Sequence, residues 1–419
     1  MKSLTSFPLS RIYGTLCALT AAATAMAAEP EARTEHWVGS WASAQQLPEP
    51  NNALSSDDLR DGTLRQVVRL SGGGARLRVR LSNAFGTQPL VIDAVHVAIA
   101  VGRGAIVPAT DRPVTFGGQS AFTIPAGADM WSDGVTFASP PLSQLAVSMH
   151  FPLPPGNQTG HPGSRATSFL VHGNLVGASV LPGAKTVEHW YQLAAIEMIG
   201  TQSSGAVVAL GDSITDGHGA TTDANNRWTD VLATRLQRRP ATQHLSVLNE
   251  GIGGNRLLLD GLGPNALARF DRDILSQAGA RYLIVLEGIN DLGTATRAKA
   301  MSVQEHAELV QRIIAAYTQI VIRARSHGIR AIGSTITPYS GFDYYHPAAA
   351  DEADRQIING WIRTRGHFDA VVDFDRTVRD PGHPERLLPA YDSGDHLHPS
   401  AAGYKAMGDS VPLSLFSPG

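Results

Sequence analysis

Ser213 is the first residue of this sequence whose type and position indicate chemistry. It stands just after the apolar run Ala206–Leu210, and Gly211 between them permits a tight turn. Open α/β sheets place their sites at the carboxyl ends of strands, and a helix that begins there directs its first amides toward an oxyanion. Ser213 is therefore a candidate nucleophile, although the tripeptide Gly211–Ser213 fits an ordinary strand-to-helix turn equally well.

A carboxylate and an imidazole near the C-terminus are the candidate partners of Ser213. Asp395 precedes His398 by three positions, and one turn of chain can hold such a pair in contact. The carboxylate would then orient the imidazole and stabilise the imidazolium that forms when His398 takes the serine proton. A polar surface turn is the alternative. His396 and Asp392 are the competing base and acid, and we expect His396, which directly adjoins Asp395, to point elsewhere.

Two segments rich in glycine and asparagine offer donors for the oxyanion of a tetrahedral intermediate. Asn249–Asn255 contains three glycines, which let backbone amides approach a substrate closely, and Gly288–Asp291 contains the side-chain amide of Asn290. Each segment follows a predicted strand. Because glycine and asparagine also commonly form turns, neither segment alone distinguishes a site from a turn.

The four segments together resemble the SGNH, or GDSL, hydrolase superfamily in order and in placement at strand ends. The resemblance extends over roughly residues 205–415 and rests on Gly211–Gly217, Asn249–Gly254, Gly288–Asp291 and Asp395–Pro399. It implies that Ser213 is the nucleophile, His398 the base and Asp395 its partner. It also implies that the amides of Ser213 and Gly254 and the side chain of Asn290 form the oxyanion hole.

Further expectations follow from the same resemblance. Gly253 is an alternative backbone donor, and Asp212 has a structural role in holding the turn. The Gly-x-Ser-x-Gly elbow of α/β-hydrolases is absent around Ser213. No cofactor is implied. A metal site formed by Asp392, Asp395, His396 and His398 has no complement in another histidine or acidic cluster, so no metal is expected.

The fold class expected for the second half is a flavodoxin-like three-layer α/β/α hydrolase domain at residues 205–415, with the five parallel strands that the resemblance implies. Short buried runs alternate with longer amphipathic ones, as in a three-layer sandwich. The predicted strands are Ala206–Leu210, Ser246–Leu248, Tyr282–Leu286, Ile329–Thr335 and Ala370–Phe374. The predicted helices are Trp228–Arg238, Ala266–Ser276, Val303–His327, Asp351–Arg365 and Ser400–Val411, the last with Ser400 as its N-cap.

The first half, residues 36–195, reads as an all-β sandwich or jelly-roll domain. Alternating segments are broken by Gly, Pro and Asn, which is typical of strands and turns. The predicted strands are Leu77–Leu81, Leu90–Ala98, Val114–Phe116, Gly134–Phe137 and Leu145–Phe151. Together with Trp37–Ala42, this half resembles the accessory domain of a bacterial subgroup that includes carbohydrate esterases.

The N-terminal residues 1–27 are predicted to be a signal peptide. Lys2 and Arg11 precede the apolar stretch Ile12–Ala23, and Ala25–Ala27 has the small-x-small pattern of a cleavage site. A membrane anchor is the alternative, but the stretch is shorter than the roughly 20 residues that span a bilayer. Export to the periplasm or medium is expected. The only cysteine, Cys17, lies in this segment, so we expect no disulfide in the mature protein.

The composition favours a folded protein that acts on a small neutral substrate or a polysaccharide ester. Lys and Arg number 34 against 37 Asp and Glu, which gives no electrostatic reason to expect nucleic acid or an anionic membrane. No later segment is long enough for stable membrane insertion.

The substrate is expected to be an O-acetyl or short acyl ester on carbohydrate. Trp131 could present an aromatic face to sugars, although Trp37, Trp41 and Trp131 also fit core positions. The segment Tyr339–His346 could line the site or pack over the sheet edge. Three alternatives stay open: a lipase or lysophospholipase, a carbohydrate-binding protein with a vestigial hydrolase domain, and acyl transfer to a glycan hydroxyl.

Overall fold

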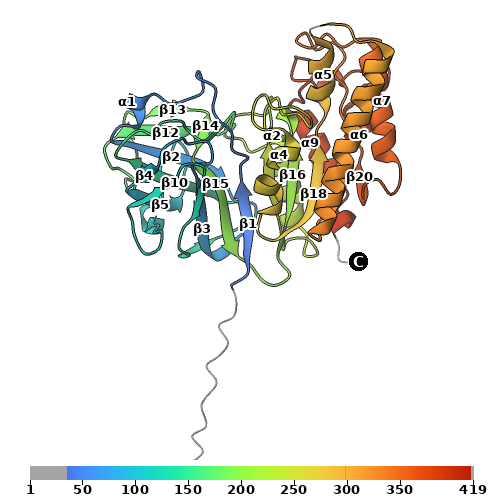
Figure 1. Cartoon of the computed structure of the whole chain (residues 1–419). Helices are drawn as coiled ribbons and strands as arrows, with labels where there is room; N and C mark the ends of the chain where they lie inside the picture. Colours follow the sequence, from blue (N-terminus) through green and yellow to red (C-terminus); the bar gives the residue numbers. More distant parts are fainter. Residues whose placement is uncertain (1–34, 298, 417–419) are drawn as a thin grey trace, which may run out of the picture. The chain divides into compact units, whose positions relative to one another are not determined.

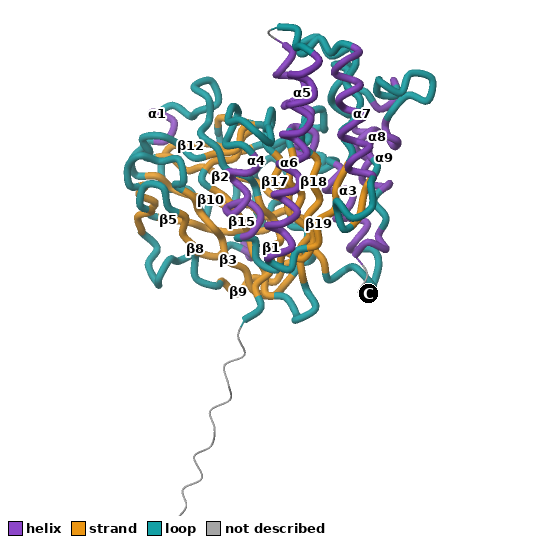
Figure 2. The backbone as a smooth tube through the Cα atoms, turned by 45° about the vertical axis from the view of Figure 1, so that its right-hand side comes forward, coloured by secondary structure: helices purple, strands orange, loops and turns teal. Residues whose placement is uncertain are grey.

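A computed structural model of the chain describes residues 35–297 and 299–416. The predicted signal peptide at residues 1–27 and Cys17 lie outside the described residues. Residues His36–Gly419 form one compact unit. It contains an antiparallel part, residues 37–199, and a parallel α/β part, residues 205–416, which Figures 1 and 2 show side by side.

The α/β part is built on five parallel strands, as predicted. Their order is β17-β16-β18-β19-β20, which in chain order is 2-1-3-4-5, the flavodoxin-like arrangement. The strands are β16 (Gly205–Gly211), β17 (Leu245–Gly251), β18 (Ala280–Leu286), β19 (Arg330–Ser334) and β20 (Ala370–Val372). Every residue of β16 is buried, because helices cover both faces of the sheet.

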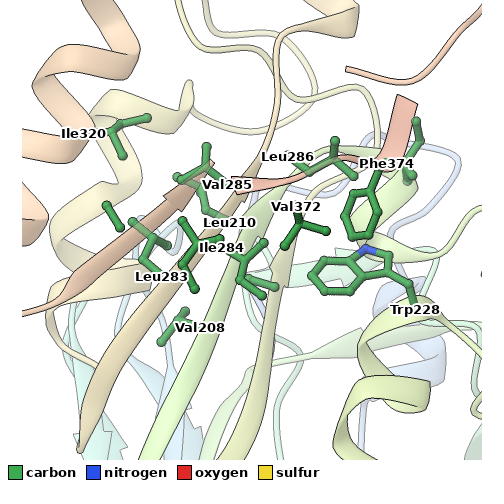
Figure 3. Close-up of a cluster of buried hydrophobic side chains, with 14 of the residues drawn as sticks. Val208, Leu210, Trp228, Leu283, Ile284, Val285, Leu286, Ile320, Val372 and Phe374 are labelled. Atoms are coloured by element: carbon green, nitrogen blue, oxygen red, sulfur yellow. The ribbon is translucent and has the colours of Figure 1, made fainter. Parts of the chain in front are cut away.

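The helices cover the two faces of this sheet in separate groups. On one face α3 packs against α9 and α9 against α8, and on the other α6 packs against α4 and α7. Figure 3 shows Trp228 of α3 beside Phe374 of α8, with Ile320 of α6 on the far side of the strands. The helices are α2 (Ser213–Asp216), α3 (Trp228–Gln237), α4 (Ala266–Phe270) with a π-helical turn (Asp271–Leu275), α5 (Ile289–Arg297), α6 (Val303–Ser326), α7 (Ala349–Arg363), α8 (Phe374–Val378) and α9 (Ala401–Ser410).

Local sequence signals explain where the principal helices begin. Ser302 caps α6 through a capping box with Glu305. Ser400 caps α9, its hydroxyl accepting a hydrogen bond from the Gly403 amide at 3.3 Å, as predicted.

The antiparallel part consists of two main sheets around one core. One sheet has the order β1-β15-β3-β8 with β9 beside β3, and the other has the order β13-β12-β2-β10-β5-β6. Their facing side chains form a shared hydrophobic core that includes Val79, Val147 and Ile196. The strands are β1 (Trp37–Ala42), β2 (Gly62–Arg69), β3 (Gly74–Ser82), β5 (Ala94–Ile99), β6 (Arg112–Pro113), β8 (Asp129–Trp131), β9 (Val135–Ser139), β10 (Gln144–Phe151), β12 (Ser168–His172), β13 (Lys185–Val187) and β15 (Leu193–Ile199).

Two smaller sheets and two short helices complete this part. One sheet is formed by β4 (Leu90–Ile92) with β7 (Phe122–Ile124), and the other by β11 (Gly160–Pro162) with β14 (His189–Tyr191). The helices are α1 (Ser56–Leu59) and a 3-10 helix (Pro108–Thr110).

The antiparallel part packs directly against the edge strand β17 of the parallel sheet. Strand β1 lies beside β17, and the Ser71 hydroxyl accepts a hydrogen bond from the Val247 amide at 2.9 Å. Val38 and Ala195 belong to the same hydrophobic cluster as Val208 of the parallel sheet. The two parts therefore share buried surface.

The structure corrects several predicted elements. Val114–Phe116 is not a strand: Phe116 forms only an isolated bridge with Gln119, and its ring stacks on Phe122 at 3.7 Å. The predicted strand Leu90–Ala98 is two strands that lie in different sheets, β4 and β5. Strand β20 ends at Val372, because Asp373 caps helix α8.

Candidate active site

Ser213 lies where the first parallel strand ends. It is the first residue of α2, immediately after β16, and is 7 % exposed. The Asp212 carboxylate accepts a hydrogen bond from the Ile214 amide at 2.9 Å and so caps this turn. At the end of β17, a Cβ on Gly251 would lie 2.3 Å from the Asp216 nitrogen. The turn that carries Ser213 therefore packs directly against the backbone of Gly251, and a side chain at position 251 would not fit.

The structure brings Ser213, His398 and Asp395 into one hydrogen-bonded chain. The Ser213 Oγ lies 2.8 Å from His398 Nε2, and His398 Nδ1 lies 2.6 Å from Asp395 Oδ2. Asp395 Oδ1 also accepts from the amides of Leu397 at 3.0 Å and His398 at 2.8 Å. With the ring proton on Nδ1 facing the carboxylate, Nε2 is left to accept the proton of the Ser213 hydroxyl.

Asp395 is held in its charged form. Burial alone would raise the pKa of its carboxyl, but hydrogen bonds from the His398 ring and from the backbone hold the pKa well below its ordinary value. The carboxylate is therefore available to stabilise a His398 imidazolium.

The competing pair is also formed, but the ring that contacts Ser213 Oγ belongs to His398. His396 Nδ1 lies 2.7 Å from Asp392 Oδ2, and the His396 side chain is 58 % exposed. The backbone of His396 is in the left-handed region, with φ of 66°. Asp392 also accepts from the amides of Gly394 and His396, so this carboxylate organises the turn that presents His398.

Candidate donors for an oxyanion lie after the ends of three neighbouring strands, β16, β17 and β18. Within the described part of the chain, the amides of Ser213 and Gly254 donate no hydrogen bond to another protein group. The Asn290 Nδ2 donates one of its two hydrogens to the Asn255 carbonyl at 2.8 Å, and the Tyr345 hydroxyl donates to Asn290 Oδ1 at 2.7 Å. The amide group of Asn290 is therefore fixed, and no group in the described ranges accepts its second hydrogen.

The aromatic segment Tyr339–His346 contributes to the site through two residues. Tyr345 fixes Asn290, as described above, and the Phe342 ring meets the His398 ring edge-on at 6.2 Å. The sequence indicated only that a segment after the fourth strand could line the site. It did not indicate that Tyr345 would contact Asn290.

Buried charges beneath the site hold the loops together. Arg269, which is 1 % exposed, donates to the carbonyls of Gly211 at 3.0 Å and Glu250 at 2.7 Å, and to Asn255 Oδ1 at 3.0 Å. It thereby links the ends of β16 and β17 to the loop that carries Gly254.

Three buried acids of this region, Asp212, Glu287 and Asp291, have raised pKa values. Burial raises the pKa of Asp212 from 3.8 to about 7, with Asp291 adding to the rise and Arg269 opposing it. Burial likewise raises the pKa of Glu287 well above its ordinary value and that of Asp291 to about 6. This cluster favours protonated carboxyls below neutral pH.

Sequence reasoning missed a contribution from the antiparallel part. Arg165 Nη2 lies 3.1 Å from His218 Nδ1, and the His218 ring lies 4.0 Å from the His398 ring, centroid to centroid. Nearby, His161 Nε2 lies 2.8 Å from Asp216 Oδ1, with both side chains buried. His218 follows Ser213 by five positions and could have been noticed, whereas nothing in the sequence connects Arg165 to the site.

One group of potential metal ligands occurs among the described residues. Donor atoms of His218, Asp395 and His398 all lie within 4.8 Å of one another. The same atoms of Asp395 and His398 also make the contacts to each other and to Ser213. Asp395 and His398 therefore already use these atoms in hydrogen bonds within the protein.

A comparison with protein-family models identifies the α/β part. Residues 209–406 match the GDSL-like Lipase/Acylhydrolase family. These residues form a GDSL-like lipase/acylhydrolase domain. The match runs from the end of β16 to α9 and so includes Ser213, Asn290 and His398. No curated protein matches the chain.

Solved structures similar to the chain cover about half of it. A GDSL-like lipase from Bacteroides thetaiotaomicron VPI-5482 is 18% identical and covers 52% of this chain and 90% of its own, with a TM-score of 0.37. The aryl esterase of M. smegmatis and Est24, a carbohydrate acetylesterase from Sinorhizobium meliloti, are each 14% identical. Each covers 51% of this chain and 99% of its own, with a TM-score of 0.39.

Family membership makes the GDSL-like domain an esterase or acylhydrolase. Its expected substrate is a small molecule or a carbohydrate ester. Among the described residues, no helix combines the length and the apolar character that a membrane crossing requires.

Proposed function

We propose that this protein is a serine esterase that hydrolyses carboxylic esters through an acyl-enzyme on Ser213. The observation that carries the proposal is the 2.8 Å contact between Ser213 Oγ and His398 Nε2, continued by the 2.6 Å contact between His398 Nδ1 and Asp395. A nucleophile, a base and an orienting carboxylate at these distances are what acyl transfer requires.

The reaction begins when His398 removes the Ser213 proton as Oγ attacks the ester carbonyl. The oxyanion is stabilised by the amides of Ser213 and Gly254 and by Asn290, whose orientation Tyr345 holds. His398 then gives its proton to the departing alcohol, leaving the acyl group on Ser213. Water, activated by His398, attacks the acyl-enzyme and releases the acid.

Short O-acyl groups on carbohydrate are the proposed substrates. The support for this proposal is the polar and aromatic side chains near His398. The rings of His218 and Phe342 contact the His398 ring, and Arg165 contacts His218. Such groups suit the hydroxyls and flat faces of a sugar. Trp131 is less available to sugar than its sequence position suggested, because the guanidinium groups of Arg78 and Arg80 lie over its ring at 4.6 and 5.4 Å.

A lipase-type activity is the second candidate. The loop after Gly254 carries Leu259, which is 61 % exposed, and Leu262, which is 46 % exposed and packs against Gly254. These side chains could receive an acyl chain beside the proposed oxyanion hole.

The deciding experiment is hydrolysis of p-nitrophenyl acetate by the wild type and by Ser213→Ala. We expect roughly a 10⁶-fold loss in the variant, and equal rates would overturn the assignment. Acetate release from acetylated xylan, set against hydrolysis of p-nitrophenyl palmitate, separates the two candidates. Formation of an acylated glycan instead of free acid would indicate acyl transfer. Binding of Ser213→Ala to insoluble polysaccharide, with no hydrolysis by the wild type, would indicate a carbohydrate-binding protein.

Export to the periplasm or medium is part of the proposal. It rests on the signal-like sequence of residues 1–27. Mass analysis of the exported protein should give an N-terminus at Ala28, and an intact Met1 would contradict it.

A further inference from the structure

His218 is an exposed side chain on a fixed backbone beside the buried His398 ring. Its amide donates to the Ser213 carbonyl at 2.9 Å, and its carbonyl accepts from the Tyr404 hydroxyl at 2.5 Å. The two imidazole rings lie 4.0 Å apart with their planes at 43°. His218 therefore has a set position relative to the nucleophile and the base.

Arg165 determines which nitrogen of His218 carries the proton. A guanidinium group only donates hydrogen bonds, so the 3.1 Å contact makes His218 Nδ1 the acceptor. In the neutral ring the proton is then on Nε2. Within residues 35–297 and 299–416, no protein group accepts a hydrogen bond from His218 Nε2. The site therefore holds an unused donor next to its base.

The loop that carries Arg165 is attached firmly to the GDSL-like domain. The Arg165 carbonyl accepts from the Asp223 amide at 3.0 Å, and Asp223 in turn accepts from the amide and hydroxyl of Thr167, each at 2.7 Å. The Arg227 side chain donates to the Ser164 carbonyl. Arg165 itself adopts a φ of 51°, a conformation that non-glycine residues rarely adopt.

His218 stays neutral near physiological pH. Partial burial of the ring, the neighbouring His398 and Arg165 lower the pKa of His218 to about 4, while Asp395 and Asp216 act in the opposite direction. A neutral ring whose tautomer is fixed presents one donor and no net charge, which suits a hydroxyl or an ether oxygen better than a carboxylate.

We propose that His218 Nε2–H donates a hydrogen bond to the alcohol part of the ester, and that Arg165 is the positioning residue that fixes this donor. This inference rests on the proposed esterase function. His398 passes its proton to the departing alcohol, so a donor on the ring beside His398 lies close to that alcohol. The substrate class is an acyl ester of a polyhydroxylated alcohol such as a sugar. The antiparallel part thus contributes to substrate recognition through Arg165.

The kinetic test compares two acetyl esters that differ only in their alcohol. Selectivity is kcat/KM for an acetylated xylo-oligosaccharide divided by kcat/KM for p-nitrophenyl acetate, whose alcohol part has no hydroxyl besides the esterified one. Loss of one hydrogen bond predicts a fall in selectivity of about fivefold or more in His218→Phe. We expect a smaller fall in Arg165→Met and recovery of much of the loss in His218→Gln, which keeps a donor. The matched control is His327→Gln, an exposed histidine at the end of α6.

The direct test is the ¹⁵N spectrum of histidine-labelled protein at pH 7. His218 should show a protonated Nε2 and an unprotonated Nδ1, and Arg165→Met should mix the two tautomers. A proton on Nδ1 in the wild type, or unchanged selectivity in both His218→Phe and Arg165→Met, would overturn the inference. If His218→Phe fails to fold, His218→Gln and Arg165→Met decide the outcome. Failure of the wild type to hydrolyse either ester would instead refute the proposed function.

Discussion

The turn at residues 392–398 contains two histidine–aspartate pairs that are nearly identical in contact distance but differ in exposure and in their contact with Ser213. His398 and Asp395 are 2.6 Å apart, and His396 and Asp392 are 2.7 Å apart. The His398 side chain is 9% exposed and that of His396 is 58% exposed. Only His398 has the Ser213 hydroxyl at its other nitrogen. A contact with a carboxylate therefore does not by itself make an imidazole a catalytic base. The imidazole must also contact the nucleophile, as His398 does.

The first prediction removes each imidazole in turn. His398→Gln should lower kcat/KM for p-nitrophenyl acetate by roughly 10⁴-fold or more, because Ser213 loses the group that takes its proton. His396→Gln should change it less than about threefold, since an exposed side chain contributes little. Comparable losses in the two variants would contradict the distinction between the pairs.

The second prediction removes each carboxylate. Asp395→Asn should cost roughly 10³- to 10⁴-fold in kcat, since His398 loses the anion that orients it and stabilises its charged form. Asp392→Asn should act mainly on stability, because Asp392 accepts from the amides of Gly394 and His396. Thermal unfolding measured beside kcat separates the two effects, and a larger kcat loss in Asp392→Asn would reverse the assignment.

The third prediction moves the nucleophile and leaves both pairs intact. A Cβ on Gly251 would lie 2.3 Å from the Asp216 nitrogen, so Gly251→Ala should displace α2 and lower kcat by about 100-fold. The matched control is Gly360→Ala in α7, where an added Cβ meets nothing within 4 Å. That variant should keep full activity and gain about 0.5–1 kcal/mol. Full activity in Gly251→Ala would show that the position of Ser213 tolerates the shift.

The smallest expected effect concerns a carboxyl without a histidine partner, Asp212. The pKa of Asp212 is raised to about 7 in the folded state. Its protonated form therefore contributes fully to the free energy of unfolding below about pH 4, and this contribution is lost as the pH rises through 7. Asp212→Asn should therefore gain stability relative to the wild type between pH 5 and pH 8, by at most a few kcal/mol. Denaturant unfolding at both pH values measures this. An identical pH dependence in both proteins would refute it.

The parallel sheet was readable from the sequence because each of its strands is a buried run between polar segments. Helix α5 was not predicted. It includes Gly293, a weak helix former, and the Tyr345 ring packs so closely there that an added Cβ would lie 2.2 Å from it. Tertiary packing, which no local pattern records, stabilises this helix.

The residues of the candidate site also differ in whether the sequence could predict them. Ser213, Asn290, Asp395 and His398 belong to segments that follow parallel strands or adjoin the last helix, so topology indicated where they would meet. Arg165 comes from a loop between two antiparallel strands, 53 positions from His218. The contact of Arg165 with His218 depends on how the antiparallel part packs against the α/β part. The periodicity of apolar residues along the chain does not predict that packing.

The most direct test of the account is covalent labelling of the intact protein by a fluorophosphonate, followed by peptide mapping. A hydroxyl activated by His398 should be phosphonylated once, at Ser213, and labelling should be retained in His396→Gln and lost in Ser213→Ala and His398→Gln. Labelling at another residue, or equal labelling of Ser213 in His398→Gln and the wild type, would contradict the claim that His398 activates Ser213.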